Sequence, residues 1–139
     1  MTDLSVTAAN VVAGTNAKKT PGTSGETVAA GKTVYRDPTS KKFLLADSDS
    51  ATAAVRDVYG IALNTASLDQ PLVVQTEGDI KVGATLVVGK IYVLSDTPGG
   101  IMPADDLEQG DYTTVIGVAS SASNLKMKIV AGGAPVPAP

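Results

Sequence analysis

The 139-residue chain contains no histidine and no cysteine. Without histidine it lacks the commonest general base and a common metal ligand, and without cysteine it lacks the strongest protein nucleophile and any disulfide. A serine-histidine-aspartate triad therefore cannot form. We expect a structural protein that is not an enzyme and that has no catalytic, cofactor-binding or metal-binding residues.

Aromatic residues are also scarce, because the chain has no tryptophan, one phenylalanine and four tyrosines. Hydrophobic residues nevertheless make up 43% of the sequence, so the core must be built from Val, Ile, Leu and Ala. Val, Ile and Thr favour strands, the 14 glycines and 8 prolines interrupt the chain often, and no segment keeps a helical period for three turns. The composition predicts an all-β protein.

The charge is low, with 11 basic and 14 acidic residues and a net charge of −3. No basic cluster is longer than Lys18-Lys19 or Lys41-Lys42, so we expect no nucleic acid partner. The first residues lack the features of a signal peptide, and no apolar run approaches the roughly 20 residues of a membrane span. We therefore expect no membrane association and synthesis in a cytoplasm.

Three polar motifs have a structural explanation that is simpler than a chemical one. The acidic pairs Asp47/Asp49 and Asp105/Asp106 are interpreted as helix caps and solubilising groups rather than as the two carboxyls of a glycosidase. The first pair begins like a calcium loop, but Thr52 and Val58 stand where that loop needs glycine and glutamate. Ser40-Lys41 is interpreted as part of a solvated hairpin.

The chain divides into three parts. Residues 1–26 are predicted to form an extended N-terminal arm, in which residues 4–12 alternate like a strand that needs a partner and residues 14–25 are mobile. Residues 27–131 are predicted to form the body. The proline-rich residues 132–139 are predicted to be a flexible tail.

The body contains an approximate internal repeat with an offset of about 57 residues. The copies run over about 31–74 and 89–127, and they predict that Tyr35 matches Tyr92 and Gly60 matches Gly117. The alternative is that two unrelated β-meanders have converged on similar turns.

Within the copies, we expect core strands at 58–63 and 113–119, and shorter strands at 72–76, 79–82 and 86–88. Short helical turns are expected at 50–55 and 105–108. The glycines between the short strands favour tight corners, and the predicted fold is a closed or nearly closed small barrel or β-tulip-like body.

The sequence resembles the small decoration, or cement, proteins of tailed-bacteriophage capsids. The resemblance rests on LSVTAANVV (4–12), AGKTVY (30–35), LAD (45–47), GIALN (60–64), VQTEGDI (74–80) and GKIYVLS (89–95). It implies a virion protein that binds the outside of an assembled head as a homotrimer and stabilises it. The implied partners are the major capsid protein and further copies of the chain.

If the resemblance holds, the N-terminal arm could add a strand to an exposed sheet edge of the shell. The residues expected to contact the capsid are then Leu4, Val6, Ala8, Val11 and Val12. The main alternative is a head-fibre or host-surface module that binds glycans, which the scarcity of aromatic residues disfavours.

Overall fold

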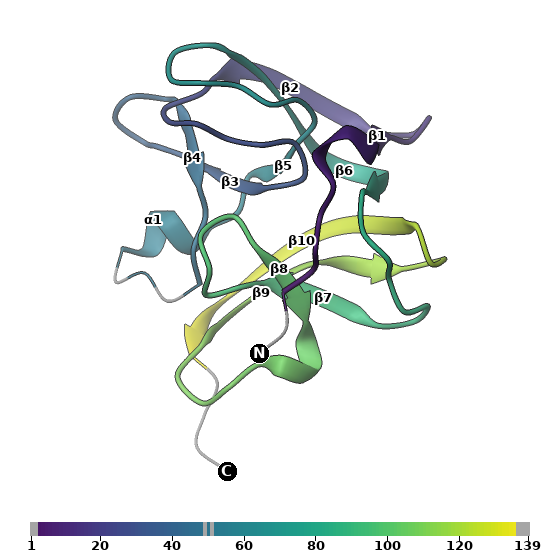
Figure 1. Ribbon diagram of the computed structural model, residues 1–139. Helices are drawn as coiled ribbons and strands as arrows, with labels where there is room; N and C mark the ends of the chain where they lie inside the picture. Colours follow the sequence, from purple (N-terminus) through teal and green to yellow (C-terminus); the bar gives the residue numbers. More distant parts are fainter. Residues whose placement is uncertain (1–2, 49, 51, 136–139) are drawn as a thin grey trace.

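The computed structural model describes residues 3–48, 50 and 52–135, and it contains ten antiparallel strands that curl into a half-barrel (Figure 1). The predicted all-β class is confirmed. The strands are β1 (Val11–Ala13), β2 (Lys18–Thr23), β3 (Thr33–Arg36), β4 (Phe43–Leu45), β5 (Gly60–Ala62), β6 (Pro71–Val82), β7 (Ile91–Leu94), β8 (Ile101–Pro103), β9 (Tyr112–Ala119) and β10 (Asn124–Pro135). Short helical turns lie at η1 (Ala8–Asn10), α1 (Ala53–Arg56) and η2 (Ala104–Asp106).

The long strand β6 organises the sheet, because four other strands pair with it. β10 and β5 pair with the two halves of one edge of β6, and β1 and β2 pair with the two halves of the other edge. Opposite β2 the register shifts, so that Lys18 pairs with Glu77 but Lys19 pairs with Gln75. Thr76 is therefore an extra residue, a β-bulge that bends and twists the strand.

β6 also corrects two sequence-based predictions. Residues 72–76 and 79–82 were predicted as separate strands, but Gly78, at φ +99, continues β6 instead of ending it. Residues 86–88 are not a strand. Glycine alone does not distinguish a turn from a bulged strand, because both use its positive φ.

Both ends of the chain are more ordered than predicted. Residues 14–25 contain β2, whose six residues pair with β6 through the backbone, which residue composition does not reveal. Within the expected flexible tail, residues 132–135 continue β10, and Pro135 lies opposite Tyr112 of β9. Residues 136–139 lie outside the described part of the chain.

The predicted duplication is visible in the strand order β4-β3-β5-β6-β10-β9-β7-β8. Counted inward from either end, the order is the second, first, third and fourth strand of a four-strand unit. The first unit (β3, β4, α1, β5, β6) and the second unit (β7, β8, η2, β9, β10) have the same connectivity, and β6 and β10 join them at the centre (Figure 1). Both units also place a helical turn between their second and third strands.

Individual hydrogen bonds repeat as well. The backbone N–H of Gly31 donates to the carbonyl oxygen of Ala62 (2.8 Å), as that of Gly89 does to Ala119 (2.9 Å). The β3–β4 and β7–β8 hairpins close in the same way, through Asp37 N–H to Lys42 oxygen (2.9 Å) and Ser95 N–H to Gly100 oxygen (3.1 Å). Lys41 and Gly99 take the same place in these hairpins, with φ of 63° and 75°.

The register between the units confirms one predicted match and corrects the other. Gly60 and Gly117 lie in the equivalent strands β5 and β9, so their match is confirmed. Gly60, however, pairs with Val34, whereas Gly117 pairs with Tyr92. The counterpart of Tyr92 is therefore Val34 and not Tyr35. Matching the two tyrosines shifts the alignment of the units by one residue. In a strand, a shift of one residue places the side chain on the opposite face of the sheet.

The core consists of two apolar clusters on opposite faces of the first unit. The larger one includes Ile61, Ile80 and Tyr92 and fills the hollow of the curled sheet. The smaller one includes Val34, Phe43 and Leu72 and lies under the loops that contain Val28 and Ala66. Phe43 and Tyr59 pack there with ring centres 5.2 Å apart. The first unit is thus buried on both faces.

Candidate functional site

The N-terminal segment, residues 3–13, runs across the body and is fastened to it at several points. The Ser95 hydroxyl donates to the Asp3 carboxylate (2.5 Å), and the Leu4 backbone N–H donates to the carbonyl oxygen of Ile101 (2.8 Å). Further along, the Thr7 N–H donates to Gly83 oxygen (2.8 Å), and β1 then joins the edge of β6. The segment is therefore part of the folded body.

Two glycines of the body make room for this segment. A methyl group placed on Gly31 would lie 2.5 Å from Val6 Cγ1, and one placed on Gly83 would lie 2.4 Å from the Thr7 carbonyl oxygen. Both glycines also have positive φ, at 90° and 77°. These positions need glycine for both backbone conformation and close approach.

The five residues predicted to contact a capsid do not share one exposed face. Leu4 and Val11 pack against the larger core cluster, and Val6 and Ala8 are half-buried. Val12 alone among the five is well exposed, at 54% of its surface. The segment is therefore not a free arm, because its partner lies within the chain, in β6 and the neighbouring core, and the capsid contact of these five residues stays a prediction.

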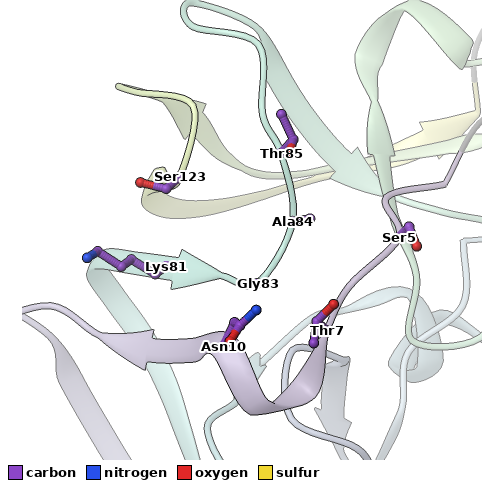
Figure 2. A pocket seen from close by; sticks show the side chains of 8 residues that line it. All are labelled: Ser5, Thr7, Asn10, Lys81, Gly83, Ala84, Thr85 and Ser123. Atoms are coloured by element: carbon purple, nitrogen blue, oxygen red, sulfur yellow. The ribbon is translucent and has the colours of Figure 1, made fainter.

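A polar groove of about 420 Å³ lies beside the segment (Figure 2). Its lining comes from the segment, from the end of β6 and the following loop, and from the loop before β10 (Figure 2). The lining residues are Ser5, Thr7, Asn10, Lys81, Gly83, Ala84, Thr85 and Ser123. Of these eight, only Lys81 carries a charge, so the groove offers hydroxyl, amide and backbone groups suited to hydrogen bonds with another polypeptide.

Lys81 is the one ionisable side chain among the groove's lining residues. None of these residues is a carboxylate that could act as a base for a hydroxyl, and none is a tyrosine. Within residues 3–48, 50 and 52–135, no cluster of acidic side chains is placed to hold a metal ion. In the same residues, no helix is both long and apolar enough to cross a membrane.

Sequence reasoning missed a set of exposed apolar side chains in the second unit and in the loop before it. Their exposure depends on sheet register and on what covers each face, neither of which follows from a short sequence pattern. They are Val87, Val88, Ile91, Val118 and Val130.

No known protein family and no curated protein sequence matches this chain.

Proposed function

We propose that this chain is a capsid decoration protein that binds the outer surface of an assembled phage head and stabilises it. The observation that carries the proposal is the N-terminal segment, which is fixed to the body while Val12 and the rim of the polar groove stay exposed. A surface that is already ordered loses little conformational entropy on binding. Such a surface suits a protein whose role is to hold neighbouring shell subunits in place.

The proposed partners are the major capsid protein and further copies of the chain in a homotrimer. The apolar residues of the N-terminal segment anchor it to the body. The exposed Val12, together with Asn10 and Thr7 at the groove, contacts the shell. Three linked sites would bind far more persistently than one, with gains of about 10² to 10⁴ for each added contact.

The alternative is a head-fibre or host-surface module that binds glycans. A hydroxyl-lined groove could hydrogen-bond a sugar, but protein sites for sugars commonly use an aromatic ring as a stacking platform. The groove residues include no aromatic side chain. The decoration role is therefore the better supported of the two, and the chain would act in the virion without chemistry of its own.

Replacement of Val12 by Asp is expected to weaken binding to expanded shells at least about tenfold, because an apolar side chain in the contact would be replaced by a carboxylate that loses its hydration on binding. Val12 is exposed, so the fold should be unaffected. The measurement is co-sedimentation of purified protein with undecorated shells, followed by thermal unfolding of the same samples.

Leu68→Asp provides the control, since Leu68 is also exposed but lies in the loop before β6. It should bind shells like the unaltered protein. Equal binding by both variants would remove Val12 from the contact, and binding to a glycan array without binding to shells would favour the alternative function.

A further inference from the structure

One row of side chains is exposed in the second unit but buried in the first. In the second unit, Ile91, Val118 and Lys126 lie side by side across β7, β9 and β10. Their counterparts in the first unit are Thr33, Ile61 and Gln75, which lie side by side across β3, β5 and β6. The first-unit row is completely buried, whereas Ile91 is 46% exposed, Val118 is 41% exposed and Lys126 is exposed.

The bulge at Thr76 accounts for this difference. One extra residue in β6 moves the side chains that precede it to the other face of the sheet. Gln75 and Ile80 therefore both point into the hollow, although five positions separate them. As a result, the first-unit row faces the larger core cluster, and the matching second-unit row faces solvent.

The exposed row belongs to a wider surface, which we call the outer face: Ile91, Val118, Lys126, Lys128 and Val130. Val130 is 53% exposed, and the exposed Lys126 and Lys128 lie opposite Asp79 and Glu77 of β6. Glu77 already bonds to Lys18 (2.9 Å), which lowers its pKa, and Lys128 adds to this effect. Three lysines (Lys18, Lys126 and Lys128) thus lie beside two carboxylates (Glu77 and Asp79), so the outer face is apolar with an excess of positive charge at its β10 side.

A complementary surface lies in residues 104–111, which we call the acidic segment. It has four acidic residues and no basic one: Asp105, Asp106, Glu108 and Asp111. Asp105 bonds to Lys90 (2.6 Å), which raises the pKa of Lys90, and Lys90 precedes Ile91 of the outer face. The two surfaces therefore adjoin at one side of the molecule.

We propose that the outer face of one copy binds the acidic segment of a second copy. A symmetric contact between two outer faces would bring Lys126 and Lys128 of both copies together, which is unfavourable. A contact between unlike surfaces avoids this repulsion, and when repeated around an axis it closes a ring. This inference rests on the proposed function in one respect, because it specifies the surfaces of the self-association that the decoration role includes.

Charge exchange tests the contact. Lys126→Glu and Glu108→Lys should each raise the dissociation constant of the oligomer about tenfold, and the double variant Lys126→Glu/Glu108→Lys should restore it. Both side chains are exposed, so each variant should fold. Light scattering and sedimentation of the isolated protein would measure the mass, which for a trimer is three times 14.0 kDa.

Lys19→Glu is the matched control, since it makes the same charge change at an exposed position on β2, opposite Gln75 of the first unit. It should leave the mass unchanged, and Val118→Asp should yield a folded monomer. A monomeric unaltered protein, or a double variant that stays as weak as the single ones, would overturn the proposal. Shell binding is measured separately, so a failed ring contact and a failed decoration role give different results.

Discussion

Replacement of Gly117 by Ala is expected to lower the free energy of unfolding by about 3 kcal/mol or more, and the melting temperature by about 10 °C. A methyl group on Gly117 would lie 2.2 Å from the carbonyl oxygen of Lys126 in the neighbouring strand β10. Carbon and oxygen do not approach so closely, and a backbone atom cannot swing aside like the end of a side chain. The pairing of β9 and β10 at the centre of the second unit would have to open.

The duplication predicts the same outcome in the first unit. A methyl group on Gly60 would lie 2.2 Å from the carbonyl oxygen of Gln75 in β6. Chemical denaturation of Gly60→Ala and Gly117→Ala would measure both losses, with Lys19→Ala as the control, because Lys19 is exposed on β2. Losses below about 1 kcal/mol for both glycine variants would contradict the described packing of these strands.

Deletion of residues 1–12 is expected to destabilise the body by about 2 to 4 kcal/mol and to abolish shell binding. The deletion removes Leu4 and Val11 from the larger core cluster and most of β1 from the edge of β6. Thermal unfolding and co-sedimentation with undecorated shells would measure the two effects. A truncated protein with unchanged stability would contradict the attachment of the N-terminal segment to the body. A truncated protein that still bound shells fully would show that the shell contact lies elsewhere on the protein.

A single substitution can detach the N-terminal segment without removing its residues. Gly83→Ala would place a methyl group 2.4 Å from the Thr7 carbonyl oxygen and should detach the segment there. Gly110→Ala is the control, because Gly110 also has positive φ but has nothing within 4 Å of the added methyl group. Only Gly83→Ala should increase hydrogen exchange at the Thr7 amide, which donates to Gly83.

The fold class and the duplication could be predicted because they depend on repeated local patterns. Continuous apolar runs marked β5 and β9, and the turn residues around Gly31 and Gly89 marked the start of each unit. Strand β2 could not be found in this way. Its sequence, KKTPGT, has little to bury, and its place in the sheet comes from backbone hydrogen bonds to β6, which depend little on the identity of the side chains.

The candidate site was predicted only in part, because its contacts join residues that lie far apart in the sequence. The alternation of residues 4–12 predicted a strand that needs a partner, but only β1 forms a strand here, Ala8–Asn10 form a helical turn, and the partner lies in the same chain. Ile91 and Val118 are exposed whereas their counterparts Thr33 and Ile61 are buried, and this difference depends on a bulge at Thr76, which lies in another strand. One extra residue in β6 turns the matching row of the first unit into the core, and no local pattern near Ile91 records it.

The central claim is that this protein binds the outside of a phage head. The most direct test is an electron-microscopy map of expanded, undecorated shells after incubation with the purified protein. We expect added density on the outer surface, at three-fold or quasi-three-fold positions, that fits the half-barrel with Val12 and the polar groove toward the shell. Shells without added density at saturating protein concentration would contradict the claim.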